Sequence, residues 1–547
     1  MSASQSAVDE LVLRVVAAAG TAADTARRRA VFARVLDELE VAPGDPAWTD
    51  GRDVVGAAYE RLVSGRVRRA LGQFFTPLPI GRAMAHWLLA DQPRLVLDPG
   101  CGSGSLLAAA DHERTAPTRL LGLDVDQLAI AMAKKNADLR AMAGLELRRM
   151  NFLTDEIAER PEAIICNPPY TRHQALTASE KEAIHEGLKE SLGIRFSQLA
   201  SLHVLFLVRA LAVAADHARL AFITPTHWLD MNYAKHVKDL VLQTAHVEAI
   251  VELPATELVF EHAITTATIT LIRKGGDGRA PTRMLRAAAT RRDAIISLLQ
   301  DSDAGTAVRL STAKKWSRAP GRANRKGPRL DEVAYVRRGA ATGCNSFFVL
   351  SDEERRLHGL NRCSLRSCIA SPRVLNVDEL DEAALAAVPD TAPRWLLVPT
   401  RERHGGPLER YLLRANTLGV HERYLVKQRV AAGRPWWLVE AEFEAPILFS
   451  YFNRQRPRFV RNRVRAVPLN NWLVIQPHGD VDADALFAAL SEPAVVARLS
   501  DDARRYGNGL WKLEPSELKQ LRLQRDRDSL TTASALISAP SLATTRS

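Results

Sequence analysis

The tetrapeptide Asn167-Pro168-Pro169-Tyr170 is the part of this chain whose residue types most directly suggest chemistry. It follows a short apolar run, residues 163–166, that is typical of a buried parallel strand. Two prolines fix φ and remove two N–H donors, so the carbonyl groups of the turn are rigid and available as acceptors. The Asn167 side-chain oxygen and the Pro168 carbonyl can each accept one N–H of a planar amine, while Tyr170 offers a flat face to a ring. Because such acceptors favour a tetrahedral nitrogen, the turn suits transfer chemistry on a conjugated amino group. Taken alone, it is also compatible with a proline-rich turn that only ends a strand.

A glycine-rich turn upstream predicts a ligand site close to the backbone. The segment Asp98-Pro99-Gly100-Cys101-Gly102-Ser103-Gly104 follows an apolar run and precedes a helical pattern. Glycines let a ligand approach the main chain closely. The next strand pattern ends at Asp124, about 25 residues further on, and an acid at this place can bind both hydroxyls of a ribose. Asp124 and Asp126 are also ordinary candidates for a helix N-cap. Together the two segments predict a nucleoside cofactor held without a pyrophosphate.

With these motifs, the chain resembles the S-adenosylmethionine-dependent DNA adenine-N6 methyltransferases, in the group whose cofactor motifs come first and whose target-recognition domain comes last. The segment 71–77, Leu-Gly-Gln-Phe-Phe-Thr-Pro, resembles the one that closes over the methionine part of the cofactor. Asn151 stands where the family has an acid that contacts the cofactor's adenine, and we expect its carbonyl to accept from the adenine amine in a weakened contact. Phe260 matches the place from which the family stacks a ring on a flipped base.

The resemblance implies two sets of site residues. The catalytic residues it implies are Asn167, Pro168, Pro169, Tyr170 and Phe260. The cofactor-binding residues it implies are Phe75, Thr76, Pro77, Asp98, Pro99, Gly100, Gly102, Gly104, Asp124, Asn151, Phe152 and Asn167. The sulfonium cofactor carries an activated methyl group, so neither a metal nor a covalent enzyme nucleophile is expected.

Strand and helix patterns alternate along the segment that carries these motifs. The strand patterns lie near residues 95–98, 119–123, 146–149, 162–166, 218–224, 247–252 and 266–272. This alternation predicts an α/β fold. In the terms of the resemblance, it is a Rossmann-like, mostly parallel, seven-stranded methyltransferase sheet whose last two strands form an antiparallel hairpin.

We expect five regions along the chain. They are an N-terminal helical lead-in (1–70), the catalytic domain (71–275), a basic connector with one helix (276–330), a mixed α+β target-recognition domain (331–527) and a disordered tail (528–547). Residues 1–320 hold 39 Lys and Arg against 37 Asp and Glu, whereas residues 321–547 hold 35 against 26. The surplus of positive charge predicts that the second half makes most of the phosphate contacts.

Two segments of the second half carry the expected DNA contacts. Residues 338–345, Arg-Gly-Ala-Ala-Thr-Gly-Cys-Asn, resemble the start of recognition domains in this family. Residues 451–465 place six arginines among aromatic residues, and arginine suits phosphates and guanine edges while aromatics suit bases. The predicted DNA-binding residues are Arg338, Thr342, Asn345, Arg454, Arg456, Arg458, Arg461 and Arg463.

The sequence therefore predicts a site-specific DNA methyltransferase that modifies adenine N6 in double-stranded DNA. A separately encoded restriction endonuclease or another defence-system protein is a plausible partner. Five cysteines without a CxxC pair, and no run of 18 uncharged apolar residues, favour a cytoplasmic protein that does not enter a membrane. Three alternatives stay open, namely methylation of a protein glutamine, methylation of RNA, and a DNA-binding module that has lost catalysis.

Overall fold

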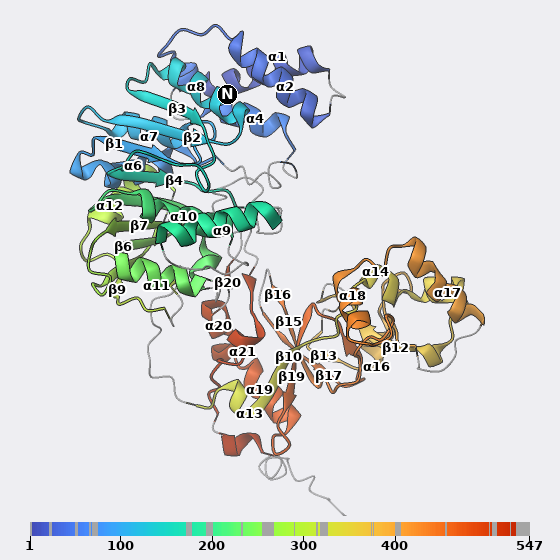
Figure 1. Ribbon diagram of the computed structural model, residues 1–547. Helices are drawn as coiled ribbons and strands as arrows, with labels where there is room; N and C mark the ends of the chain where they lie inside the picture. Colours follow the sequence, from blue (N-terminus) through green and yellow to red (C-terminus); the bar gives the residue numbers. More distant parts are fainter. Residues whose placement is uncertain are drawn as a thin grey trace, which may run out of the picture. The chain divides into compact units, whose positions relative to one another are not determined.

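The computed structural model divides into two compact units, residues 1–321 and 322–547, and each is described by itself (Figure 1). The described residues are 3–20, 24–49, 53–64, 67, 75–170, 178–192, 201–230, 234–253, 267–288, 290–312, 316–317, 327–372, 375, 377–399, 406–453, 457–502, 504–505, 511–525 and 527–531. Of the helices in these ranges, none is long and apolar enough to cross a membrane.

A nine-stranded sheet forms the centre of the first unit. Its strands are β1 (Leu95–Asp98), β2 (Arg119–Asp124), β3 (Leu145–Arg149), β4 (Ala163–Cys166), β5 (Arg219–Pro225), β6 (Ala245–Glu252), β7 (Ala267–Lys274), β8 (Thr282–Arg286) and β9 (Thr306–Val308). They lie in the order β3-β2-β1-β4-β5-β7-β6-β8-β9. Strands β1 to β5 pair in parallel, and β7 runs antiparallel to both β5 and β6. The seven predicted strands and the antiparallel hairpin are thus confirmed.

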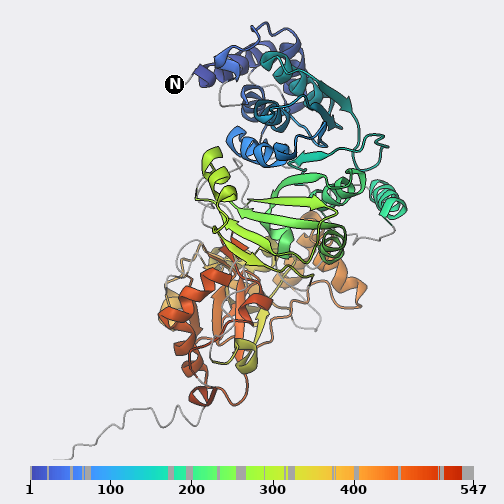
Figure 2. The ribbon, with the colours of Figure 1, turned by 90° about the vertical axis from the view of Figure 1, so that its left-hand side faces the viewer.

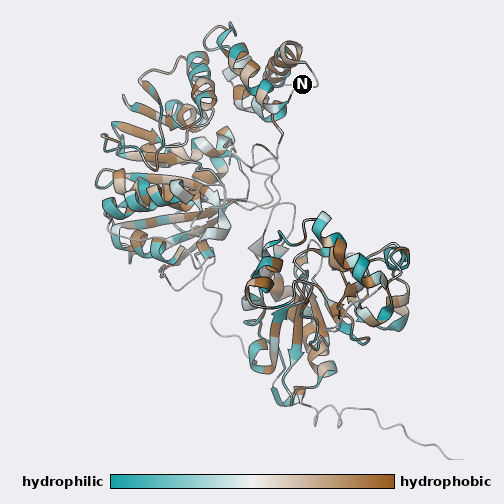
Figure 3. Cartoon of the chain, turned by 45° about the vertical axis from the view of Figure 1, so that its right-hand side comes forward, coloured by the Kyte–Doolittle hydropathy of each residue, from teal (hydrophilic) through white to brown (hydrophobic). Residues whose placement is uncertain are grey.

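Helices cover both faces of this sheet (Figure 2). On one face lie α6 (Leu78–Leu88), α7 (Ser105–Glu113) and α12 (Arg292–Gln300). On the other lie α9 (Ala178–Leu192), α10 (Leu202–Val213) and α11 (Lys235–Thr244). The central strands are apolar on both faces, as parallel strands between two helical layers must be, and they are largely brown in Figure 3.

The predicted connector is more structured than expected at its start. Strand β8, helix α12 and strand β9 fall within residues 276–312 and extend the sheet beyond β6. Their apolar residues explain this, because Leu285, Ile295 and Val308 are buried in or beside the sheet. Further on, Trp316 is fully buried, and its backbone N–H bonds to the carbonyl of Leu229 at 3.0 Å, so this segment returns to the turn after β5.

In the described part of residues 3–64, four helices form a separate apolar layer that packs against α8 (Gln127–Arg140). They are α1 (Ala3–Ala19), α2 (Thr25–Asp37), α3 (Pro46–Thr49) and α4 (Val54–Leu62). Their buried side chains follow the helical spacing seen in the sequence. Since α8 begins directly after β2, this layer lies next to the part of the sheet that carries the glycine-rich turn.

The second unit is mixed α+β. A five-stranded sheet has the order β10-β19-β15-β17-β13, a four-stranded sheet β11-β14-β12-β18, and a three-stranded sheet β16-β21-β20. The strands are β10 (Ala334–Arg338), β11 (Val349–Leu350), β12 (Leu365–Ile369), β13 (Glu379–Leu380), β14 (Trp395–Leu397), β15 (Ile447–Ser450), β16 (Phe452–Asn453), β17 (Phe459–Asn462), β18 (Val467–Pro468), β19 (Trp472–Pro477), β20 (Arg504–Arg505) and β21 (Trp511–Lys512). The helices are α13 (Leu330–Val333), α14 (Asn345–Phe348), α15 (Asp352–Leu357), α16 (Glu382–Ala386), α17 (Gly406–Thr417), α18 (Tyr424–Ala431), α19 (Ala483–Ser491), α20 (Pro493–Asp502) and α21 (Pro515–Leu518).

Candidate active site

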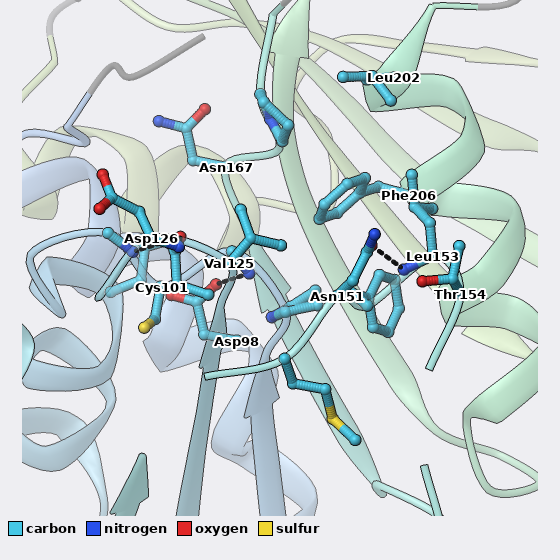
Figure 4. Close-up of a pocket in the computed structure, with 18 of the residues that line it drawn as sticks. Asp98, Cys101, Val125, Asp126, Asn151, Leu153, Thr154, Asn167, Leu202 and Phe206 are labelled. Carbon is cyan, nitrogen blue, oxygen red and sulfur yellow. Dashed lines mark hydrogen bonds between the residues drawn. The ribbon is translucent and has the colours of Figure 1, made fainter. Parts of the chain in front are cut away.

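A cavity of about 800 Å³ opens where the carboxyl ends of β1, β2 and β4 meet. Ligands of open α/β sheets bind at this edge. The structure brings to it residues from eight separate stretches of the first unit, several of which are drawn in Figure 4. The predicted residues that line the cavity are Phe75, Thr76, Asp98, Pro99, Gly100, Gly102, Asp124, Asn151, Phe152, Asn167 and Pro169.

The glycines of the turn after β1 have distinct steric roles. A Cβ at Gly100 would lie 3.5 Å from the ring of Phe206, and one at Gly102 would lie 3.3 Å from the ring of Phe75. Gly104 has a φ of 79° and would place a Cβ 3.2 Å from the backbone of Ala133 in α8. Gly100 and Gly102 therefore keep the cavity open, whereas Gly104 lets α7 start against α8 and does not itself line the cavity.

Two carboxylates line the cavity, of which Asp98 is buried and Asp124 is half-buried. Asp98 is 1% exposed and accepts a hydrogen bond from the Gly100 N–H at 3.3 Å. Burial, with a smaller effect from the charge of Asp124, raises the pKa of Asp98 to about 8. Asp124 accepts from the N–H groups of Gly102 at 3.0 Å and Asp126 at 2.9 Å, and burial raises its pKa too. Such a pair favours a ligand that brings hydroxyl donors and positive charge.

An aromatic pair forms the wall beside Asn151. The rings of Phe152 and Phe206 lie 5.2 Å apart and both line the cavity, which suits the planar base of a nucleoside. The Asn151 side-chain oxygen accepts from the N–H of Leu153 at 3.1 Å, drawn as a dashed line in Figure 4. The expected acceptor for an adenine amine is therefore already bonded to its own turn and keeps only its second lone pair for a ligand.

Phe206 lines the cavity and was not among the residues predicted from the sequence. It lies four residues after Leu202 in α10, so both side chains occupy one face near the start of the helix and both line the cavity. That spacing was visible in the sequence, but the run from 202 to 213 is apolar almost throughout and does not show which face meets a ligand.

The turn after β4 places its residues differently around the cavity. Asn167 and Pro169 line it, while Pro168 is buried beneath the turn. The Tyr170 hydroxyl donates to the carbonyl of Ile223 in β5 at 3.3 Å, and its ring meets that of His203 edge-on at 6.3 Å. Phe260 lies outside the described residues.

The cavity residues fit S-adenosylmethionine. The hydroxyl of Thr76 is buried in the cavity wall, and it has no hydrogen-bond partner within the part of the chain that the structure describes. It therefore offers a polar group to a ligand. The carboxylates of Asp98 and Asp124 suit the ammonium and ribose groups, and the ring pair Phe152–Phe206 suits the base. Pro77, which caps α6, stands next to this wall without lining it.

In the second unit, the first predicted DNA segment is built around a buried threonine. Thr342 is 1% exposed, and its hydroxyl accepts from the Cys344 N–H at 3.1 Å and donates to the Asn345 side-chain oxygen at 2.5 Å. Thr342 thus shapes the turn and holds the exposed Asn345, so it is placed to support a contact and not to make one. Arg338 lies over the ring of Tyr451 at 4.5 Å and forms an ion pair with Glu514 at 2.7 Å.

Described arginines of the second segment bond within their own domain. Arg461 is 12% exposed, forms an ion pair with Asp484 at 2.7 Å and donates to the carbonyl of Pro446 at 2.9 Å. Arg463 bonds to Asp484 at 2.9 Å, and Arg458 donates to the carbonyl of Leu375. For two of them the reason is the position of β17, because Arg461 within the strand and Arg463 just after it both meet the Asp484 carboxylate of α19. Arg454 and Arg456 lie outside the described residues.

Comparison with known proteins agrees with this architecture. Residues 50–290 match the family described as N-6 DNA Methylase, and residues 320–539 match the family described as Type II methyltransferase M.Eco57I, C-terminal domain. The Type II methyltransferase M.AccI of Acinetobacter calcoaceticus is 25% identical, over 84% of this chain and 87% of the relative. The Type II methyltransferase M.XamI of Xanthomonas campestris pv. amaranthicola is 29% identical, over 83% of this chain and 85% of the relative.

Among solved structures, the Type IIL restriction-modification enzyme MmeI in complex with DNA has a TM-score of 0.57 at 12% identity. The match covers 91% of this chain and 73% of that one, and it shows a shared fold. Together with the two family matches, which leave only the ends and a short middle segment uncovered, it accounts for both units. The chain belongs to the S-adenosylmethionine-dependent N6-adenine DNA methyltransferases of restriction-modification type.

Proposed function

We propose that the protein is an adenine-specific, site-specific DNA methyltransferase that acts on the N6 of an adenine rotated out of the duplex. The observation that carries this proposal is that Asn167 and Pro169 line the same cavity as Asp98 and Thr76. The amine-binding turn and the cofactor residues therefore face one space. Because N6 of a paired adenine lies within the stack, the base must leave the helix to reach it.

Each residue of the turn then has a distinct task. The Asn167 side-chain oxygen and the Pro168 carbonyl accept the two N6 protons, and Tyr170 stacks on the base from a ring that its bond to Ile223 holds in place. Phe260 is proposed to cover the opposite face of the base. These acceptors stabilise the positive charge that develops on N6.

The reaction needs alignment more than acid–base chemistry. When bound, S-adenosylmethionine supplies an activated methyl group. The N6 lone pair forms the new carbon–nitrogen bond as the methyl–sulfur bond breaks, the electron pair of that bond leaves with S-adenosylhomocysteine, and the proton that N6 loses passes to water. The cavity residues contribute by holding the two reactants in line, which removes most of the entropic cost of their meeting.

We further propose that the second unit reads the DNA sequence, and that a separately encoded restriction endonuclease recognises the same site in the cytoplasm. The family match of residues 320–539 to a Type II methyltransferase domain supports the first part. The names of the relatives M.AccI and M.XamI, both Type II methyltransferases, support the second.

The test is transfer of a tritiated methyl group to genomic DNA, followed by sequencing that locates methylated adenines in cells with and without the gene. We expect N6-methyladenine within one short motif. Label found in protein glutamine or in RNA, with none in DNA, would contradict the proposal and favour one of the other methyltransferase alternatives.

A further inference from the structure

Arg29 links the N-terminal helices to the cofactor cavity. It lies on α2, lines the cavity, and has a side chain that is 22% exposed. One terminal nitrogen donates to the Asp126 carboxylate at 2.6 Å, and the other donates to the hydroxyl of Tyr59. The guanidinium carbon also lies 5.5 Å from the centre of the Tyr59 ring. Two anchors of different kinds therefore hold this cation at the cavity wall.

The surroundings of Arg29 are built into the core. Tyr59 on α4 is fully buried, and its ring meets the ring of Phe75 edge-on at 6.0 Å. Phe75 in turn lines the cavity and lies against Gly102. An unbroken set of packed rings thus runs from the N-terminal helices to the glycine-rich turn.

A second bridge ties the same helices to the same turn. Asp53 caps the start of α4 by accepting from the Gly56 N–H at 2.8 Å. Its carboxylate also accepts from the Ser103 hydroxyl, which belongs to the glycine-rich turn, and from the Asn136 side chain of α8 at 2.9 Å. The N-terminal helices therefore contact the cofactor site at the glycine-rich turn, through Asp53, as well as at the cavity wall, through Arg29.

The position of Arg29 within the cavity points to one end of the cofactor. Its partner Asp126 stands two residues after Asp124, and the Asp126 N–H donates to the Asp124 carboxylate at 2.9 Å. Asp124 is the acid at the end of β2, the place of the ribose hydroxyls in this kind of site. A guanidinium has five N–H donors, and the bonds to Asp126 and Tyr59 use two of them.

We propose that Arg29 is a cofactor-binding residue that donates hydrogen bonds to the ribose oxygens, so that the N-terminal helices complete the cofactor site. A ribose hydroxyl then donates a hydrogen bond to the Asp124 carboxylate and accepts one from the Arg29 guanidinium, so its donor and its acceptor capacity are both used. The inference rests on the proposed function, because it assumes that S-adenosylmethionine occupies this cavity.

The test compares Arg29→Met with the matched control Arg34→Met in the full-length protein. Both residues are on α2. The side chain of Arg34 is 60% exposed, against 22% for Arg29, and it pairs with Glu38 at 3.7 Å on the surface. Titration calorimetry is done with S-adenosylhomocysteine and with 5′-methylthioadenosine, which lacks the amino-acid part. We expect Arg29→Met to weaken both ligands by about tenfold or more, the scale of a hydrogen bond to a charged group. Arg34→Met should leave both affinities within about twofold, as for an exposed pair.

Several outcomes would overturn the inference. Unchanged affinities in a folded Arg29→Met protein would remove Arg29 from the site, and a loss confined to S-adenosylhomocysteine would move it from the ribose to the methionine end. Circular-dichroism melting shows whether the variant is folded. If it is not, Arg29→Lys replaces it, since lysine keeps the charge but loses the fork and should still weaken both ligands. Failure of the wild-type protein to bind either ligand would instead contradict the proposed function.

Discussion

The hydroxyl of Tyr170 donates to the backbone carbonyl of Ile223 at 3.3 Å, which ties the turn after β4 to the neighbouring strand β5. The ring that is proposed to stack on the base is thereby oriented by the sheet itself. We predict that Tyr170→Phe keeps stacking and loses only the tether, so kcat should fall by up to about tenfold, the worth of one neutral hydrogen bond. Tyr170→Ala should cost far more. Single-turnover methylation measures both, and equal rates for the two variants would contradict this division of roles.

Asn167 is predicted to matter more for the reaction than for the affinity of the cofactor. Asn167→Ala removes one acceptor for the N6 protons, and the loss of a transition-state hydrogen bond of this kind costs about 100-fold or more in kcat. S-adenosylhomocysteine should still bind within a few-fold of wild type. Near-normal methyl transfer by the variant would remove Asn167 from the catalytic role.

At the end of β2, Asp124→Ala should weaken cofactor binding by about 1.5–3 kcal/mol, because hydrogen bonds to a charged group are lost. Asn151 makes a contrast, since its side-chain oxygen already accepts from Leu153 at 3.1 Å. Asn151→Asp keeps that bond and should change the affinity little. Calorimetry on both variants checks the pair, and a large gain from Asn151→Asp would show that the family's acid makes a contact that asparagine does not.

The sequence predicted the sheet well because its strands are local signals. All seven strand patterns lie within a few residues of the observed strands, and the motifs at their ends meet at one edge because parallel strands require it. Strands β8 and β9 were not predicted, because their sequences give only a weak local strand signal. Strand β9 has three residues, of which only Val308 is buried, and it is held by pairing with β8, which precedes it in the chain.

Site residues were missed where the partner is remote in sequence. Arg29 pairs with Asp126 across 97 residues, and nothing near Arg29 marks it as part of a cavity. The arginines at 461 and 463 show the same limit in reverse. The sequence suggested that they are free basic side chains, yet both donate hydrogen bonds to the carboxylate of Asp484, which is 23 and 21 residues away.

The raised pKa of Asp98 leads to a prediction about stability without cofactor. The folded-state pKa is about 8, above the unfolded value of about 3.9. Between these values the folded state binds more protons than the unfolded state, so the free energy of unfolding should fall as pH rises from about 4 to 8. The slope from this one group is at most about 1.4 kcal/mol per pH unit.

Asp98→Asn is the matched variant, because the amide cannot ionise and has nearly the same shape. Urea unfolding of the cofactor-free variant should show a weaker loss of stability over this pH range than the wild type. Saturating S-adenosylhomocysteine should also flatten the wild-type curve, since its ammonium group stabilises the ionised carboxylate. Parallel pH curves for the two cofactor-free proteins would show that Asp98 is ionised throughout.

Arg461 and the pair Arg454 and Arg456 should separate structure from DNA contact within one basic segment. Arg461 is 12% exposed and bonded to Asp484 and Pro446, so Arg461→Ala removes one of the two arginines that pair with Asp484 and one of the donors to the Pro446 carbonyl. We expect a lower melting temperature in this variant, with DNA affinity per folded molecule close to wild type.

Arg454→Ala and Arg456→Ala should leave the melting temperature unchanged. If they contact phosphates, each should weaken DNA binding for all sequences and reduce the salt slope by about one unit. If they read bases, each should relax discrimination at one position by about 1–3 kcal/mol. Filter-binding titrations at several salt concentrations, on cognate and scrambled duplexes, distinguish the two. If Arg461→Ala lowers the salt slope without affecting the melting temperature, Arg461 is a phosphate contact and its bond to Asp484 opens on DNA.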